Sequence, residues 1–384
     1  MKTDPAFSVS PAHPTGRIAP AVRHGVYWIT FCGVLGAGCS EDSPWVETRH
    51  ARIQGEHGVC AGLETYVDER IEVTADWFEL EPGPKIDIYL GQSYVDEQQE
   101  NYDYPIGGIA SRRNGDVTVY ARGYNLGHEL VHAVRFSNGL VLPSLIDEGV
   151  AKLYDGGEFN GNGGGISYRI PEGATLPDDP HTATVGVAAT FTGWLHETLP
   201  HEDFLRLVND PDLNREYGAA SNWERIEGAT GMGKEVLEER WASEAQHYYS
   251  EVPRCRPERT HQLEVGEPLQ IEDTVSCTDS PTTFGPYALL DDVVTTEQRL
   301  HCFPFDVPTS VRITASGPPG SELVFYRADS SCLTSTPRTE ETDVKRIELG
   351  TTAEFVFGDC TWVGRVRSEP DTVGEVSITM VAIE

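Results

Sequence analysis

Residues 127–132 read GHELVH, an H-E-x-x-H pattern inside a segment that is predicted to be helical. In a helix, His128 and His132 lie one turn apart on the same face, so that both imidazoles can bind a single Zn²⁺. Glu129 then lies beside the open side of the metal, where a carboxylate can take a proton from a metal-bound water and pass it to a leaving group. The pattern therefore predicts a zinc site with Glu129 as its general base and acid.

A zinc site of this kind needs a third protein ligand, and the candidate is Glu148, 16 residues after His132. It lies in a second predicted helix, residues 145–154, which Ser144 could cap. Each residue also has an ordinary structural explanation. Two histidines on a helix are often only partly exposed side chains, and Glu148 could be an acid favoured by the helix dipole. The three residues together favour the metal site.

The segments around these helices predict a small sheet and a group of helices. Residues 86–90 alternate apolar and polar side chains, as in a half-buried strand, and Asn114-Gly115 predicts a tight hairpin turn before a strand at 117–120. Apolar residues recur at helical spacing in four more stretches, at 62–80, 184–199, 202–208 and 234–249. We interpret their apolar faces as core-packing surfaces.

After a predicted linker at residues 253–260, the pattern changes to short alternating runs separated by turn signals such as GPPG at 317–320. Six or more short strands without helices are typical of a β-sandwich. The sequence thus predicts an all-β sandwich domain at residues 256–384, preceded by a separate domain at 40–255. The predicted strands are at 287–290, 310–314, 323–326, 346–349, 354–357 and 376–381.

The first 39 residues have the features of an export signal. Basic residues precede a 13-residue apolar run at 26–38, which is too short to span a bilayer and suits the apolar part of a signal peptide. The run ends at Cys39 and resembles a bacterial lipoprotein signal, although Leu35 lies four residues before the cysteine rather than three. We therefore expect an exported protein that is either secreted or held at the cell envelope by a lipid on Cys39.

Eight cysteines are present, and none belongs to a C-x-x-C pair. This argues against a thiolate zinc site and favours disulfides in an oxidising compartment. Removing Cys32 with the leader and lipidating Cys39 leaves six cysteines, an even number. Sequence alone does not determine the pairing. The working hypothesis joins neighbours within the second domain and the two ends of the first: Cys277 with Cys302, Cys332 with Cys360, and Cys60 with Cys255.

The chain carries 61 acidic against 29 basic side chains, a formal charge of −32. So acidic a protein cannot hold nucleic acid by neutralising its phosphates, and that class of function is excluded. A well-solvated surface explains the charge. A preference for basic substrates is the alternative, and no other feature of the sequence supports it.

The two predicted zinc helices resemble those of the gluzincin metallopeptidases, in which two histidines of one helix and a glutamate of the next bind zinc. Residues 143–151, PSLIDEGVA, match the P-x-x-x-x-E-G-x-A second helix of a bacterial envelope branch of that family. Weaker likeness continues at residues 189–195 and 229–241. The resemblance covers about residues 45–250 and is strongest over 124–155. It implies an α+β class with a thermolysin-like zincin fold for the first domain: a small twisted sheet, the two zinc helices and a helical lobe.

The resemblance also implies a function. His128, His132 and Glu148 would bind Zn²⁺, and Glu129 would activate water to hydrolyse a peptide bond in a peptide or protein substrate. Lys152, however, stands where many gluzincins have an acid that orients a zinc-binding histidine.

The group that orients the zinc-binding histidine would then be Asp147, Asp155 or a backbone carbonyl. The residue that would stabilise the oxyanion is also unidentified, and the candidates are Tyr154, Tyr168 and His181. These departures leave a second hypothesis open. In it, the chain is a catalytically inactive envelope protein that keeps the metallopeptidase fold and acts in binding or adhesion through its β-sandwich.

Overall fold

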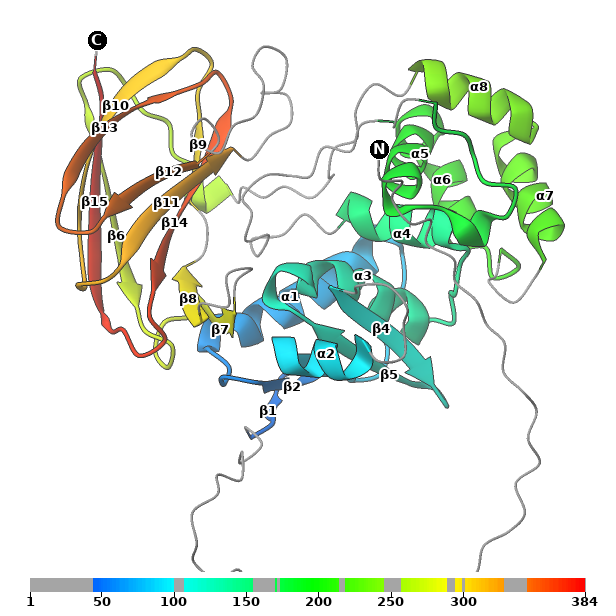
Figure 1. Cartoon of the computed structure of the whole chain (residues 1–384), viewed down its shortest axis with the longest axis horizontal. Helices are drawn as coiled ribbons and strands as arrows, with labels where there is room; N and C mark the ends of the chain where they lie inside the picture. The colour runs from blue at the N-terminus through cyan, green and yellow to red at the C-terminus, as the bar shows by residue number, and fades with distance from the viewer. Residues whose placement is uncertain are drawn as a thin grey trace, which may run out of the picture.

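The computed structural model describes residues 44–99, 107–154, 170, 173–213, 218–244, 257–288, 294–298, 301–327 and 344–383. Within these residues the chain forms eight α-helices and three open sheets, which confirms the expected α+β class. Figure 1 shows a small sheet with its helices at the lower centre, a group of helices to the right and two further sheets to the left. The predicted leader, residues 1–39, lies outside the described residues. None of the helices in the described part has both the length and the apolar character that crossing a membrane requires.

The first sheet consists of β1 Val46–Glu47, β2 Ala51–Gly55, β3 Ile86–Leu90, β4 Gly108–Arg113 and β5 Asp116–Ala121. Its strand order is β1-β2-β3-β5-β4. The three central strands are parallel, whereas β1 and β4 are antiparallel edge strands. The predicted hairpin turn is confirmed, because Asn114 and Gly115 have φ of 55° and 95° and join β4 to β5.

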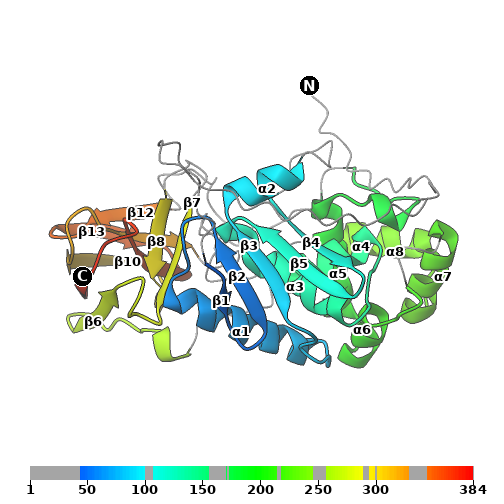
Figure 2. The ribbon, with the colours of Figure 1, turned by 90° about the horizontal axis from the view of Figure 1, so that it is seen from below.

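Three helices accompany this sheet: α1 Ala61–Trp77, α2 Gln92–Gln99 and α3 Leu126–Ser137, with the short turn η1 Gly123–Asn125 just before α3. Ile71 of α1 and Leu130 of α3 share one buried cluster with Ile88 of β3, so both helices cover the same face of the sheet. In Figure 2, α2 lies on the opposite side. Because only η1 separates β5 from α3, the sheet fixes where the H-E-x-x-H helix begins.

The group of helices is α4 Ser144–Tyr154, α5 Val185–Thr198, α6 His201–Val208, α7 Ala219–Thr230 and α8 Lys234–Glu244. They enclose a second buried cluster. α4 and α5 approach closely at Gly149, where an added Cβ would lie 2.1 Å from Thr192 Oγ1 and 2.4 Å from the Ala188 carbonyl oxygen. The Thr192 hydroxyl donates a hydrogen bond to the Leu145 carbonyl at 3.1 Å. The glycine after Glu148 is therefore a packing requirement of α4.

The C-terminal strands are β6 Pro268–Val275, β7 Thr283–Ala288, β8 Val294–Gln298, β9 His301–Pro304, β10 Thr309–Ser316, β11 Glu322–Arg327, β12 Val344–Glu348, β13 Thr352–Phe357, β14 Thr361–Ser368 and β15 Gly374–Ile383. One sheet has the order β13-β10-β15-β6. The other has the order β12-β11-β14-β8-β7, with β9 paired to β14. Val311 lies in the sheet that contains β10, and Phe325 and Trp362 lie in the sheet that contains β11 and β14. All three belong to the same buried cluster, so these two C-terminal sheets share a core.

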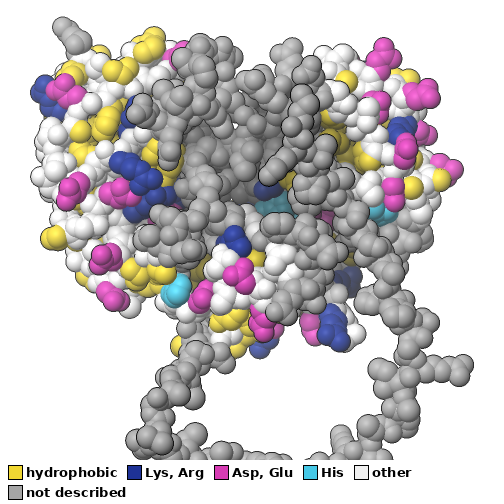
Figure 3. Space-filling model, in the orientation of Figure 1, with side chains coloured by type: hydrophobic (Ala, Val, Ile, Leu, Met, Phe, Trp, Pro, Cys, Tyr) yellow, Lys and Arg dark blue, Asp and Glu magenta, His cyan; other side chains and the backbone are white. Residues whose placement is uncertain are grey.

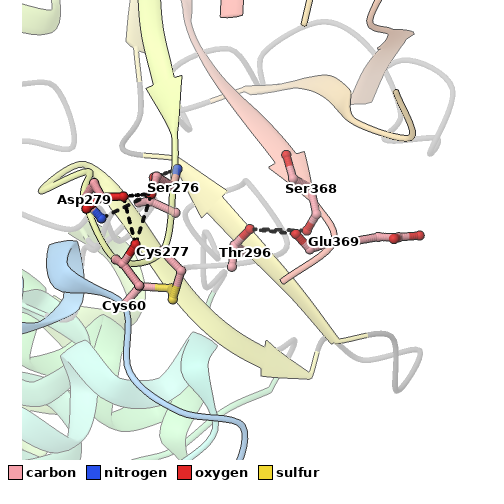
Figure 4. The surroundings of a disulfide bond; sticks show 9 residues. Cys60, Ser276, Cys277, Asp279, Thr296, Ser368 and Glu369 are labelled. Atoms are coloured by element: carbon pink, nitrogen blue, oxygen red, sulfur yellow. Dashed lines mark hydrogen bonds between the residues drawn. A yellow bond between two sulfur atoms is a disulfide. The ribbon is translucent and has the colours of Figure 1, made fainter. Parts of the chain in front are cut away.

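The C-terminal strands are fastened to α1 through β7 and the segment before it. Cys60, just before α1, forms a disulfide with Cys277, and Figure 4 shows this bond beside the loop that follows β6. Phe284 of β7 belongs to the buried cluster of the first sheet and meets the Tyr66 ring edge-on at 5.9 Å. An added Cβ at Gly62 would lie 2.4 Å from the Thr283 carbonyl oxygen. The two parts are thus joined by a covalent bond and by an interlocking core.

This junction corrects two of the expected disulfides. Because Cys60 pairs with Cys277, the predicted pairs Cys60–Cys255 and Cys277–Cys302 are both wrong. Cys302 is disulfide-bonded, as is Cys360. Residues 255 and 332 lie outside the described residues, so the predicted partner of Cys360 stays a prediction. The pairing follows the docking of β7 on α1, which the order of cysteines along the chain does not reveal.

Several elements differ from the expectation. Helix α1 ends at Trp77, before the predicted end at residue 80. The hairpin turn implied a strand before it but did not give the bounds of β4. The elements that were not predicted are α2, α7, β6, β8, β9 and β14. The segments of α2 and α7 are polar, so they lack a strong apolar stripe. The large acidic excess is not gathered in one place on the face drawn in Figure 3, where acidic and basic side chains are interspersed over both parts of the molecule.

Candidate metal centre

Helix α3 is buried along most of its length because it lies between two cores. Leu130 packs against the first sheet, and Val131 packs into the cluster of the helical group. His128 and His132 occupy the face that meets α4, where Glu148 is located. The packing on both sides of α3 fixes its histidine face relative to α4.

The three predicted ligands converge. His128 Nε2 lies 3.2 Å from His132 Nε2 and 3.3 Å from Glu148 Oε2. His132 Nε2 lies 3.7 Å from Glu148 Oε1. Within the described residues, these three form the one group of metal-ligating side chains whose ligand atoms come together in this way.

These separations fit a tetrahedral zinc ion. Ligand atoms about 2.0–2.2 Å from a tetrahedral zinc lie about 3.3–3.6 Å from one another. The observed distances of 3.2, 3.3 and 3.7 Å, in which the two histidines are measured to different oxygens of Glu148, fall close to this range. Two imidazoles and one carboxylate, with a fourth position left for water or substrate, are a donor set of catalytic zinc sites. The residues present therefore fit the metal.

Asp147 contacts the proposed ligand His132 at the ring nitrogen that does not face the metal position. Its Oδ2 lies 3.0 Å from His132 Nδ1, the ring nitrogen that faces away from the other ligands. The side chain is 10% exposed. Of the three alternatives left open by Lys152, the geometry thus favours Asp147, while Asp155 lies outside the described residues. Such a contact fixes the orientation of the imidazole ring.

Glu129 lies on the side of α3 that faces the edge strand β4. It is 5% exposed and accepts a hydrogen bond from the backbone of Ala110. Its side chain passes so close to Gly108 that an added Cβ there would lie 2.7 Å from Glu129 Oε1. Burial raises the pKa of Glu129 to about 7, with the charge of Glu148 adding to this effect and His132 opposing it. The carboxyl can therefore both accept and donate a proton near neutral pH.

The neighbouring charges set the protonation of the ligands. Burial lowers the pKa of His128 to about 4, with help from the positive charge of Lys152. Burial would raise the pKa of Glu148, but a hydrogen bond to His128 and the charge of His132 hold it at about 2. Burial would lower the pKa of His132, but Asp147 and Glu148 raise it to about 9. Glu148 is therefore ionised, and binding of a metal at neutral pH would displace a proton from His132.

The candidates for stabilising an oxyanion have other contacts. Tyr154 packs its ring against Trp77 at 4.8 Å and Phe78 at 4.9 Å, inside the helical core. His181 lies in a short turn before α5, and its Nε2 lies 3.0 Å from Asn222 Nδ2 of α7. Tyr168 lies outside the described residues. The oxyanion donor thus stays unassigned.

No protein-family model matches the chain, and no curated protein matches it. The expected resemblance to gluzincins therefore rests on the motif residues alone, and the structure adds that His128, His132 and Glu148 come together.

Arg135 and Gly108 also belong to the site, and the sequence analysis did not predict either of them. Arg135 lies one turn after His132 and approaches Asp147, with Nε 3.4 Å from Asp147 Oδ1. Its spacing along α3 could have placed it on the same side as His132. Gly108 had no such signal, because the predicted hairpin turn does not determine where the strand before it begins.

Proposed function

We propose that the chain is a zinc-dependent peptidase of the gluzincin type, with His128, His132 and Glu148 as ligands and Glu129 as general base and acid. The observation that carries the proposal is the convergence of the ligand side chains: the two Nε2 atoms lie 3.2 Å apart, and each lies 3.3 or 3.7 Å from an oxygen of Glu148, close to the spacing around a tetrahedral zinc. When bound, zinc would polarise the substrate carbonyl and make water a stronger nucleophile.

The role of Glu129 follows from its surroundings. The carboxylate is held by the Ala110 backbone and lies beside Gly108, so it cannot swing freely. Burial brings its pKa to about 7, near the value that suits a group which takes a proton and then returns it. Glu129 would take the proton of the attacking water and deliver it to the leaving amine.

A peptide substrate is supported by the edge strand. In the described residues β4 pairs only with β5, so its other edge has backbone groups available for a further strand. This strand also contacts Glu129 through Gly108 and Ala110. An extended peptide that paired with β4 would therefore bring its backbone carbonyls beside the catalytic carboxylate.

We also propose a fold for each of the two domains and export of the protein from the cytoplasm. A thermolysin-like zincin domain would comprise the first sheet, α3, α4 and the helical group, and the two C-terminal sheets with their shared core would form a β-sandwich. The Cys60–Cys277 disulfide supports an exported protein, because such bonds persist in oxidising compartments. Secretion and anchoring by a lipid on Cys39 are the two forms this export would take.

The test is a pair of glutamate substitutions. Glu129→Gln should leave zinc binding intact and lower peptide hydrolysis by about 10²–10⁴-fold, since proton transfer is lost. The matched control is Glu197→Gln, because Glu197 also follows a histidine in a helix but is exposed on α5. The control should hydrolyse peptides at the wild-type rate. Full activity of the Glu129→Gln protein would refute the assigned role.

The unassigned oxyanion donor favours one alternative, a zinc-binding envelope protein without catalysis that acts in binding or adhesion. It predicts that the wild-type protein binds zinc and hydrolyses no member of a diverse peptide library. Hydrolysis that is sensitive to Glu129→Gln would exclude it.

A further inference from the structure

Arg135 is a fully buried charge within the metal-binding part of the molecule. Its exposed fraction is 0%, and it lies on α3 one turn after His132. Removing a guanidinium from water is costly unless its charge and its donors are satisfied. A residue that only filled space here would be better replaced by an apolar side chain, so its contacts need an explanation.

The contacts of Arg135 lead in two directions. Toward the core, Nη2 donates a hydrogen bond to the Val208 carbonyl at 2.8 Å, and the guanidinium lies 5.0 Å from the centre of the Phe78 ring. Toward the site, Nε lies 3.4 Å from Asp147 Oδ1. Arg135 therefore connects the end of α6 and the residue after α1 with a carboxylate on α4.

Asp147 is shared between Arg135 and a proposed zinc ligand. Its Oδ1 faces Arg135, while its Oδ2 lies 3.0 Å from His132 Nδ1. The two oxygens of one carboxylate thus link a buried cation to the imidazole whose other nitrogen points at the metal position. A carboxylate with both oxygens engaged cannot rotate without losing one contact.

We infer that Arg135 is a positioning residue of the metal site, which fixes the Asp147 carboxylate so that Asp147 holds the His132 ring in its metal-binding orientation. The inference rests on the proposed metal site but not on peptide hydrolysis. It assigns Arg135 an action through Asp147, beyond its packing in the core.

A matched control separates positioning from packing. Arg70 of α1 is also a buried arginine, 6% exposed, and its guanidinium also lies 5.0 Å from an aromatic ring, that of Trp77. It lies on α1, which carries neither a proposed zinc ligand nor Asp147. Arg70→Met and Arg135→Met therefore remove comparable buried groups, and only the second should affect the metal.

The experiment measures zinc affinity by competition with a chromophoric chelator, together with thermal unfolding of the metal-free proteins. Arg135→Met should weaken zinc binding about 10–100-fold, the usual effect of losing a partner of a metal ligand. Arg70→Met should bind zinc like the wild type even if its melting temperature falls. The double variant Arg135→Met/Asp147→Asn should bind zinc no more than about 3-fold more weakly than Asp147→Asn alone, because Arg135 acts through Asp147.

The Arg135→Lys variant keeps the charge and guards against a failure of Arg135→Met to fold. Lysine lacks the planar fork of arginine, so zinc affinity should fall by about 3–10-fold. The inference is overturned if Arg135→Met, or Arg135→Lys where only that variant folds, binds zinc like the wild type. It is also overturned if Arg70→Met weakens binding equally, or if the effects of Arg135→Met and Asp147→Asn multiply in full. A wild-type protein that binds no zinc would instead refute the metal site itself.

Discussion

Two sets of two histidines and a carboxylate can be compared in this molecule: His128, His132 and Glu148 of the helices, and His261, His301 and Asp273 of the C-terminal strands. In the helical set, one nitrogen of each imidazole points at a common position. In the strand set, the side chains instead contact one another in a row, with His301 in the middle. His301 Nδ1 lies 3.0 Å from His261 Nε2, and His301 Nε2 lies 3.3 Å from Asp273 Oδ2.

The difference comes from the elements that carry the residues. Histidines four apart on α3 must lie side by side, and a facing helix brings the carboxylate between them. His301 on β9 instead has both ring nitrogens engaged by neighbours, and Arg259 lies 3.4 Å from the Asp273 carboxylate. The strand set satisfies its own charges, whereas the helical set directs its donors to one common position. Convergence of donors, and not residue composition, distinguishes a metal site.

The largest expected effect is the loss of a ligand from the helical set. His132→Ala should weaken zinc binding about 100-fold or more, because it removes one of three protein ligands. In a structural zinc site of about 10–16 kcal/mol, each of the four ligands contributes roughly a quarter of the binding energy. His301→Ala should leave zinc affinity unchanged. Zinc titration of both variants checks the comparison, and an equal loss in the two proteins would show that the strand set also binds the metal.

A smaller effect should follow from moving α4. Gly149→Ala would force a methyl group against Thr192 and the Ala188 carbonyl, which should cost about 1–3 kcal/mol of stability and weaken zinc binding through Glu148. Gly228→Ala is the matched control, because Gly228 lies on α7 with open space around it. That change should be neutral or stabilise the protein by up to about 1 kcal/mol. Chemical unfolding measures both. A Gly149→Ala protein as stable as the wild type would mean that α4 and α5 are not packed this closely.

The smallest effect concerns acid stability of the strand set. Burial would raise the pKa of Asp273, but His301 and Arg259 hold it below its usual value. A carboxyl with a lowered folded pKa stabilises the protein above its unfolded pKa, about 3.9, and this contribution is lost as pH falls through the folded value. Asp273→Asn should therefore be less stable than the wild type near pH 6, and the difference should shrink toward pH 3.

Urea unfolding at several pH values measures this difference. A gap between Asp273→Asn and the wild type that stays constant down to pH 3 would show that the Asp273 charge contributes nothing. Zinc binding should be the same in both proteins at neutral pH.

Local patterns predicted the core of the candidate site well. The spacing of His128 and His132, and the second helix with Glu148, follow from helical periodicity, and the structure brings these residues together. The hairpin at Asn114-Gly115 is equally local. Asp147 could be named only as one alternative of three, because its contact with His132 depends on the angle between α3 and α4.

Features that depend on distant segments escaped prediction. Arg135 acquires its contacts from Val208, which is remote in sequence. The disulfide of Cys60 depends on how β7 docks against α1, so neighbouring cysteines were paired wrongly. The bounds of strand β4 were missed, although the hairpin turn implied a strand before it, because its half-buried residues show no clear alternation. These features result from tertiary packing, which periodicity does not encode.

X-ray absorption spectroscopy of the zinc-loaded protein shows whether His128, His132 and Glu148 bind one zinc ion. The metal-free chain would be titrated with zinc, and the spectrum would be recorded at one equivalent. We expect one tightly bound zinc with two imidazole nitrogens and one carboxylate oxygen at about 2.0–2.2 Å, and loss of that signal in His128→Ala. A protein that binds no zinc at micromolar concentration, or that gives the same spectrum without His128, would contradict this expectation.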